Sequence, residues 1–239
     1  MTLTFQETMA LTMRSIQRLS RERISLIFGL IQPMLFWLIL FGNLFEKTAR
    51  IPGVMGTDYI TYLTGGVVAM TVLNSGLSGG VDLLFDRESG FLERLLAAPI
   101  SRNALIYSRF AFVMGITSLQ ILVILLVAFL LFGVFPAGGI GALAFILLIG
   151  LMFGLGLIAI SLTLAFAIKG HGNFFALMGF LTLPLIFLST ALVPFEAMPG
   201  WMAFLAKFNP MTYAVEAIRG MIIGGWELRA VAGFMGVLV

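Results

Sequence analysis

Five long apolar windows restrict what this chain can fold into. A helix needs about 20 apolar residues to cross a hydrocarbon layer of ~30 Å, and each window reaches that length. Overall, 60% of the residues are hydrophobic and only 10% are charged, which is unlike a soluble domain. The windows do not alternate polar and apolar residues as barrel strands do, so we expect helices. The expected spans cover residues 24–45, 59–84, 104–134, 140–168 and 174–194.

The two ends of the sequence bear on the number of spans. Residues 230–239 are apolar but rise only ~15 Å as a helix, about half a bilayer, so we interpret them as the first half of a sixth span that continues beyond Val239. The polar start of the chain argues against a cleaved signal peptide. The prediction is therefore one all-α membrane domain over residues 1–239, a six-span helical bundle whose sixth span is incomplete.

Basic residues predict the orientation of this bundle. With a cytosolic N-terminus, nine basic residues lie inside and five outside, in agreement with the positive-inside tendency. The net charge of +3 follows from this bias, and no nucleic-acid partner is expected because no basic stretch is interleaved with aromatic residues. The inside set is Arg14, Arg18, Arg21, Arg23, Arg87, Arg94, Arg102, Arg109 and Lys169; the outside set is Lys47, Arg50, Lys207, Arg219 and Arg229.

A charged segment, residues 85–100, separates the second and third expected spans. Within it, four apolar residues recur at helical spacing and predict a narrow ridge on one amphipathic helix. Such a helix is longer than a simple turn requires, and a ridge needs a groove to fill. We therefore predict that a separate cytosolic protein docks here. The predicted docking residues are Arg87, Glu88, Gly90, Phe91, Leu92, Glu93, Arg94, Leu95 and Leu96.

Residues 1–23 form a second amphipathic element. One helical face is apolar and the opposite face is basic. The apolar residues are Phe5, Met9, Met13 and Ile16, and the basic ones are Arg14, Arg18 and Arg21. This pattern is typical of a helix in the inner membrane interface, with its arginines toward lipid headgroups or a partner. A simple anchor and a docking role both remain open.

Residues 195–227, expected on the outer side, contain two short apolar helices that are too short to span. We expect Asn209 to cap the second helix, Pro210 to take its first position and Gly224-Gly225 to end it. The pattern predicts a re-entrant hairpin that acts as a gate or as a lid. Glu216 and Arg219 are spaced to pair on its wetter face. The predicted gate residues are Asn209, Pro210, Tyr213, Glu216 and Arg219.

The spans contain few ionisable residues. Asp82 and Arg109 lie near cytosolic span ends, whereas ion-coupled carriers usually place charges at mid-membrane depth. An ion-coupled carrier or a channel is thus the alternative class. A neutral, weakly polar interior suits an amphipathic or hydrophobic substrate that is moved by an outside energy source. Our candidates for the substrate pathway are Gln32, Asn74 and Gln120.

No motif in the sequence predicts catalysis. The serines of residues 74–79 lack a base, because His171, the single histidine, is expected in a solvated loop at the far end of another span. Without cysteine, disulfides and ordinary zinc chemistry are excluded, and no phosphate-binding P-loop is present. The motifs Gly76-x-x-x-Gly80 and Gly150-x-x-x-Gly154 predict close helix packing, either within the bundle or at a dimer seam.

Three stretches resemble the type-2 ABC transporter permeases, in order and in spacing. Residues 88–102, ESGFLERLLAAPISR, resemble the signature around the first cytosolic loop of that family. Residues 209–219, NPMTYAVEAIR, resemble its second signature, found before the last span. Residues 32–36, QPMLF, are similar to the drug-resistance branch. Together they extend the resemblance over essentially the whole chain.

The resemblance implies half of a transmembrane pore. Two copies would pair in lipid as a homodimer, through the first and fifth spans, and each would dock one separate cytosolic ABC ATPase at a coupling helix, residues 85–100. ATP and Mg²⁺ would bind the ATPase, and this chain would bind no cofactor. Such permeases export hydrophobic drugs, lipids, polysaccharides and lipid-linked polymers. The short outer loops favour a lipid-like or drug-like amphiphile over a polymer, and the implied location is the bacterial plasma (inner) membrane.

Overall fold

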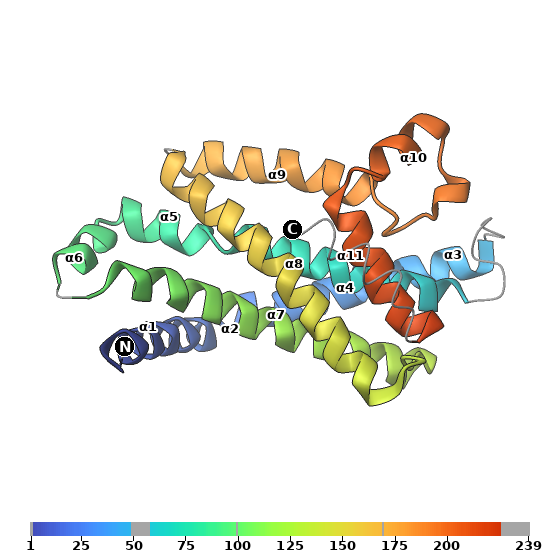
Figure 1. The fold of residues 1–239 in the computed structure, drawn as a ribbon, viewed down its shortest axis with the longest axis horizontal. Coiled ribbons are helices and arrows are strands. Elements are labelled where there is room, and N and C mark those ends of the chain that lie inside the picture. The colour runs from blue at the N-terminus through green and yellow to red at the C-terminus, as the bar shows by residue number, and fades with distance from the viewer. Residues whose placement is uncertain (1, 49–57, 99, 169, 226–239) are drawn as a thin grey trace.

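The computed structural model describes residues 2–48, 58–98, 100–168 and 170–225, and these residues form helices joined by turns and short connections (Figure 1). In chain order the elements are α1 (Thr2–Arg21), α2 (Arg23–Gln32), the π-helix η1 (Pro33–Phe41), α3 (Gly42–Thr48), α4 (Tyr59–Ser78), α5 (Val81–Glu88), α6 (Phe91–Ala97), α7 (Arg102–Phe132), α8 (Gly139–Ala167), α9 (His171–Phe187), the 3₁₀ turn η2 (Phe195–Ala197), α10 (Gly200–Ala206), α11 (Pro210–Arg219) and the π-helix η3 (Gly220–Gly224).

The bundle is elongated. The helices α1, α5 and α6 lie at one end, and α3 and α10 lie at the other, with α4, α7 and α8 running between them (Figure 1). We refer to these two ends as the α6 end and the α10 end. The three helices of the predicted cytosolic side thus share one end, and the predicted outer hairpin lies at the opposite end.

Four helical stretches are long and apolar enough to cross a membrane: Ile27–Phe45, Tyr59–Glu88, Arg102–Phe132 and Gly139–Ala167. They correspond to the first four predicted spans. The predicted fifth span, residues 174–194, is instead the shorter apolar helix α9, which has 17 residues and contains Pro184. Beyond the end of this helix, Thr190 O and Leu192 O accept hydrogen bonds from tyrosines of α4. The predicted sixth span lies outside the described residues.

The first span is not a regular α-helix. Its middle is the π-helix η1, which begins at Pro33. Proline has no N–H, and its ring crowds the carbonyl one turn earlier, so the α-helical ladder does not continue unchanged. A row of rings follows the wider turns: Trp37, Phe41, Phe45 and Tyr59 contact in sequence with centroid distances of 5.1, 5.6 and 5.7 Å. Because Tyr59 begins α4, these contacts hold the first span against the centre of the bundle.

The helix α4 is the centre of the fold. Almost all of its residues are buried, and it packs against α7, α8 and α11. Its approach to α8 depends on small residues: a Cβ added to Gly76 would lie 2.7 Å from Leu157 Cβ. In the same way, a Cβ added to Gly150 of α8 would lie 2.8 Å from Ile121 Cδ1 of α7. Packing within one chain therefore accounts for both glycine motifs, and no dimer seam is needed to explain them.

A methyl group at Gly76 should separate α4 from α8. We predict that Gly76→Ala destabilises the chain by about 1–3 kcal/mol, the usual cost of overpacking, as measured by unfolding in detergent. Gly115→Ala is the matched control, because Gly115 of α7 has open space where a Cβ would stand; it should be neutral or stabilising by up to ~1 kcal/mol. Equal stability of the two variants would contradict the close approach.

Candidate functional site

The segment predicted as one docking helix consists of two helices. The first, α5, ends at Glu88, and α6 begins at Phe91, with Gly90 between them at φ 68°. Glycine adopts this left-handed conformation at little cost, and α6 turns out of line with α5 (Figure 1). The prediction of a single helix over residues 85–100 is therefore wrong. Its first turn prolongs the second span, and α6 is a separate two-turn element.

The apolar ridge of α6 faces the bundle more than a partner. Leu92 is buried, and Leu95 packs against the core. The ring of Phe91 lies 3.9 Å from the guanidinium carbon of Arg14 on α1, a favourable cation–π geometry. The spacing thus identified a real apolar ridge, but most of its groove belongs to this chain. The outer face of α6 consists of Glu93, Arg94, Leu96 and Ala97.

Two of the predicted docking residues also contact other helices of this chain. Arg87 donates from Nη1 to Phe166 O at 2.9 Å, at the carboxyl end of α8, where helix carbonyls otherwise lack partners. Glu88 pairs with Nδ1 of His171, whose ring lies 4.3 Å from that of Phe85. His171 is the first residue of α9. Because of these contacts it is not the solvated loop residue that was predicted. These contacts join the end of α5 to α8 and α9.

The helix α1 exposes its apolar face, and its arginines stay exposed although two of them contact α5. The exposed apolar residues are Phe5, Met9, Met13 and Ile16, as predicted for an interfacial helix. The opposite face packs on α7, where Glu7 Oε2 accepts from Ser101 N and Oγ at 3.1 and 2.9 Å. Arg14 and Arg18 reach carboxylates of α5. Both side chains remain about half exposed, at 45% and 46%, so their predicted contact with headgroups or with a partner stays a prediction.

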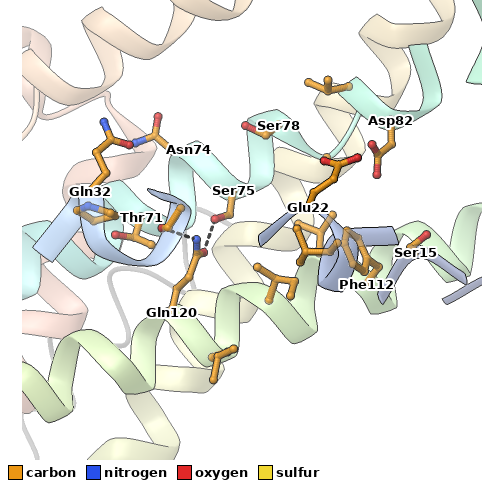
Figure 2. A pocket seen from close by; sticks show the side chains of 18 of the residues that line it. Ser15, Glu22, Gln32, Thr71, Asn74, Ser75, Ser78, Asp82, Phe112 and Gln120 are labelled. Carbon is orange, nitrogen blue, oxygen red and sulfur yellow. Dashed lines mark hydrogen bonds between the residues drawn. The ribbon is translucent and has the colours of Figure 1, made fainter. Parts of the chain in front are cut away.

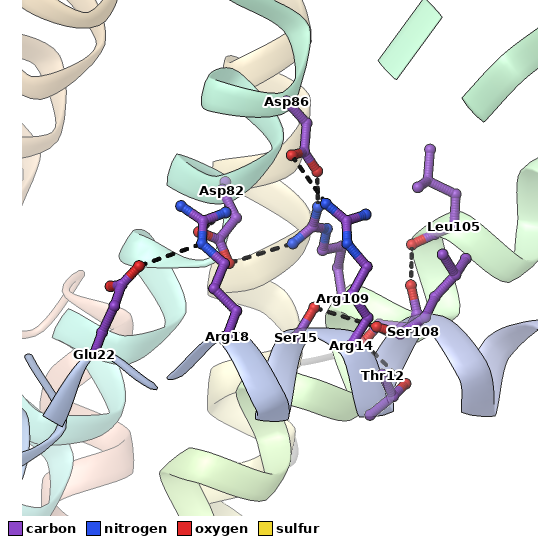
Figure 3. A network of polar contacts seen from close by, with 12 residues as sticks. Thr12, Arg14, Ser15, Arg18, Glu22, Asp82, Asp86, Leu105, Ser108 and Arg109 are labelled. Atoms are coloured by element: carbon purple, nitrogen blue, oxygen red, sulfur yellow. Dashed lines mark hydrogen bonds and ion pairs between the residues drawn. The ribbon is translucent and has the colours of Figure 1, made fainter. Parts of the chain in front are cut away.

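Arg109 is the centre of an ion-pair network at the α6 end (Figure 3). Its guanidinium contacts Asp82 Oδ2 at 3.3 Å and forms a second, short ion pair with Asp86. The Arg109 and Asp86 side chains are only 8% and 7% exposed. From α1, Arg18 lies 3.7 Å from Asp82, and Arg14 lies 3.8 Å from Asp86. Three helices, α1, α5 and α7, therefore meet through charges of opposite sign.

Asp82 and Arg109 were expected near span ends, but the ion pair between them was not predicted. A signal was available: Asp82 and Asp86 are one helical turn apart, so both carboxylates lie on one face. A buried charge is stable only when it is paired, so a basic residue near the end of a neighbouring span was the expected partner. Three cations and three carboxylates, counting Glu22 on Arg18, leave the network without net charge.

A cavity of about 520 Å³ lies between the first span, α4 and α7 (Figure 2). All three predicted substrate-pathway residues line it: Gln32 at the end of α2, Asn74 on α4 and Gln120 on α7. The same cavity reaches the network, because Arg18, Glu22, Asp82 and Arg109 line its α6-end wall. It therefore has a neutral polar part and a charged part, with apolar walls between them. Its aromatic lining residues are Trp37, Phe112 and Phe175.

At the α10 end, the predicted cap of α11 is present, and the same residue also bonds to the end of α9. Asn209 Oδ1 accepts from Met211 N at 2.9 Å, and Pro210 occupies the first position of α11, both as predicted. Asn209 also donates from Nδ2 to Leu185 O and Leu188 O at 2.9 and 2.6 Å. The residue is 7% exposed, so it fixes the start of α11 to the end of α9 in a poorly hydrated place. Tyr213 donates to Lys207 O at 2.7 Å and ties α11 to the end of α10.

The predicted Glu216–Arg219 pair is present, at 2.7 Å. Arg219, however, is buried and not on a wet face. Its guanidinium lies 3.5 Å over the Tyr62 ring and donates to Tyr62 O at 3.2 Å and to Thr190 O at 2.7 Å. It thus holds α11, α4 and the turn after α9 together. As predicted, the helical course ends at Gly224, where Gly225 has φ 75°.

These features define a multi-pass membrane protein with a cavity between its spans. Among the described residues, no three His, Asp or Glu side chains gather to hold a metal ion. The cavity is lined by amides, hydroxyls and paired charges. Several spans around such a cavity are the architecture of a transmembrane transporter subunit.

Comparison with known proteins agrees with this class. Residues 6–223 match the model of the family described as "ABC-2 type transporter", so the chain belongs to that family. It is 39% identical over 215 residues to the putative transport permease ycf38 of Porphyra purpurea, covering 90% of this chain and 73% of that protein. ABC-2 permeases are the membrane subunits of ABC transporters, and membership implies an ABC ATPase subunit as partner.

Two further relatives carry names of drug-resistance permeases. The chain is 26% identical over 239 residues to the probable doxorubicin resistance ABC transporter permease protein DrrC of Mycobacterium tuberculosis, covering 96% of this chain and 81% of DrrC. It is 24% identical over 216 residues to the daunorubicin resistance ABC transporter permease protein DrrB1 of Streptomyces coeruleorubidus, covering 87% and 73% of the two chains.

Removing Arg109 should destabilise the α6 end. We predict that Arg109→Leu costs about 3–5 kcal/mol, because it leaves the buried Asp86 without its closest partner, and that it lowers the unfolding temperature in detergent. Adding Asp86→Asn should recover a large part of the loss. Arg102→Leu, at an exposed position on the same helix, is the control and should change stability by less than about 0.5 kcal/mol. A stable single Arg109→Leu variant would contradict a structural role for the network.

Proposed function

We propose that this chain is the transmembrane subunit of an ATP-driven exporter that moves an amphipathic or hydrophobic, lipid-like or drug-like substrate out of the cell. The observation that carries the proposal is the cavity: it joins neutral polar groups, aromatic walls and a charged end within spans of an ABC-2 family member. A separate ATPase binds ATP and Mg²⁺ and supplies the energy. This chain supplies the path and the surface on which that energy acts.

The substrate class rests on the character of the cavity and on the relatives. Aromatic rings and amide groups in one cavity suit a molecule with an apolar body and a polar head. The names of two relatives refer to drug resistance, which supports a drug-like substrate over a polymer. A polysaccharide or lipid-linked polymer is the second candidate, although short outer connections favour the smaller substrate. An ion-coupled carrier is less well supported, because the charges nearest the spans neutralise one another at one end.

The ATPase docks, in this proposal, on the outer face of α6, with the N-terminus in the cytosol of a bacterial cell. Glu93, Arg94 and Leu96 present that face, and Leu92 and Leu95 seat the helix on the bundle. A push on α6 therefore reaches α1 through the Phe91–Arg14 contact and reaches α5 through the short turn at Gly90. Two copies pair in the membrane to complete the path, and the hairpin at the α10 end gates its exit.

An apolar-to-charged change on the outer face of α6 should prevent docking. Leu96 is 50% exposed, so Leu96→Asp leaves this chain folded but places an unpaired charge in the ATPase groove, which costs several kcal/mol. We expect capture of the ATPase subunit by the purified variant to fall by about tenfold or more.

Leu205→Asp is the matched control for docking, because Leu205 is 44% exposed on α10 at the opposite end. It should capture the ATPase as the unmodified chain does. Wild-type capture by Leu96→Asp would reject the outer face of α6 as the docking surface. ATP-dependent movement of a labelled amphiphile in vesicles, lost in Leu96→Asp and kept in Leu205→Asp, then tests the exporter itself.

Single cysteines should report the orientation, because the chain has none of its own. Glu93 and Lys207 are exposed charged residues at the α6 and α10 ends. In intact cells, an impermeant thiol reagent should label Lys207→Cys directly and Glu93→Cys only after permeabilisation. The reverse result would overturn the cytosolic N-terminus. A labelling rate at Lys207→Cys that changes when the ATPase is trapped with nucleotide would support a gate, and a constant rate would leave a lid.

A further inference from the structure

One amide spans the neutral part of the cavity. Gln120 of α7 accepts from Ser75 Oγ of α4 at 2.6 Å through Oε1 and donates to Gly29 O of α2 at 3.1 Å through Nε2 (Figure 2). Each of these groups keeps unused capacity, since an amide offers two N–H donors and two acceptor lone pairs. The Gln120 amide is therefore held in a fixed orientation and still has one donor and one acceptor position for a ligand.

Other uncharged groups surround this amide without being consumed by the fold. Asn74 donates to Met70 O of its own helix at 2.9 Å, and its side-chain oxygen has no donor among the described residues. Gln32 and Ser78 also line the cavity, and neither side chain forms a hydrogen bond to another described residue. Three spans thus bring amide and hydroxyl groups to one place. Groups of this kind bind a hydroxyl, carbonyl or amide, as donors and as acceptors.

The charged wall of the same cavity offers little to an ionic head. Its cations, Arg18 and Arg109, are already paired with its carboxylates, Glu22 and Asp82. To bind Arg109 or Asp82, an anionic or a cationic head would have to break the pair between them and leave a charge uncompensated beside the buried Arg109, which is costly. The Arg18–Glu22 pair is about half exposed and contributes little to this selection. The charged wall therefore selects against a net charge, whereas the neutral wall favours hydrogen bonding.

We infer that the cavity between the first span, α4 and α7 is a binding site, complete within one chain, for an amphiphile with an uncharged, hydrogen-bonding head. Gln120 and Asn74 bind the head, and the rings of Trp37 and Phe112 contact the apolar body. The inference deepens the proposed function, on which it rests for its biological role, by naming the substrate class and the residues that select it.

Tryptophan fluorescence tests this site without the ATPase. Of the three tryptophans, Trp37 lines the cavity and Trp201 lies exposed on α10. One variant retains only Trp37 (Trp201→Phe, Trp226→Phe), and a second retains only Trp201 (Trp37→Phe, Trp226→Phe). The probes are three amphiphiles with the same brominated chain, which quenches nearby tryptophan, and with a glycerol, sulfate or trimethylammonium head. The variants are titrated in nanodiscs of unlabelled lipid.

Saturable quenching of Trp37 by the glycerol probe, at a concentration about tenfold lower than for either charged probe, is the expected result. Quenching of Trp201 should follow bulk partitioning for all three probes. Asn74→Leu should weaken glycerol-probe binding by about tenfold, the usual effect of one hydrogen bond to a ligand, and it removes no tertiary contact. Gln120→Leu should do the same, and Thr163→Val, on an exposed face of α8, should change nothing.

Equal binding of the three heads at Trp37, or unchanged binding by Asn74→Leu, would overturn the inference. These outcomes are separate from the exporter proposal. Selective binding together with no ATP-dependent movement in vesicles would keep the site and remove the exporter. ATP-dependent movement with unselective quenching at Trp37 would keep the exporter and remove this site.

Discussion

The burial of Arg109 between Asp82 and Asp86 is the interaction on which the α6 end of the molecule depends. Arg109 and Asp86 are both buried, so each requires a partner of opposite charge, and the partly exposed Asp82 adds a second carboxylate to Arg109. Because Arg109 belongs to α7 and both carboxylates belong to α5, the pairing fixes the second span against the third. Arg14 and Arg18 then attach α1 to the same carboxylates. The position of this amphipathic helix is thus set by charges at the end of the bundle.

The same interactions relate the docking helix to the cavity. The helix α6 rests on Arg14 through Phe91, and Arg14 rests on Asp86, one turn from Asp82 in the cavity wall. A displacement of α6 therefore acts on groups that line the cavity within two contacts. Packed elements joined in this way move between discrete arrangements more readily than they deform continuously. The proposed coupling needs no path beyond these contacts.

The α10 end is stabilised by a different device. Arg219 is also buried, but its main partners are the backbone carbonyls of Tyr62 and Thr190, with Glu216 at its outer side. Asn209 likewise bonds to the carbonyls of Leu185 and Leu188. Asn209 satisfies carbonyls that α9 frees where it ends, and Arg219 satisfies the carbonyl of Thr190 in the turn that follows; such groups must find partners in a poorly hydrated site. The hairpin at this end is consequently tied to the bundle through the end of α9.

The sequence by itself determined the class and the outline. Apolar length predicted the first four spans. Turn and cap residues located the start of α11 at Pro210 and the end of the following η3 at Gly224. The polar residues Gln32, Asn74 and Gln120 were picked out as candidates for one pathway. These features are local, and so they can be read along the chain.

The directions of side chains are not local. Whether the ridge of α6 faces a partner or its own bundle, and which carboxylate receives Arg109, depends on helices far apart in the sequence. Helical periodicity identifies which residues share a face of a helix but not what that face packs against. Only the tertiary packing decided that Leu92 is buried and that Arg87 and Glu88 bond to α8 and α9. It also decided that three spans enclose one cavity.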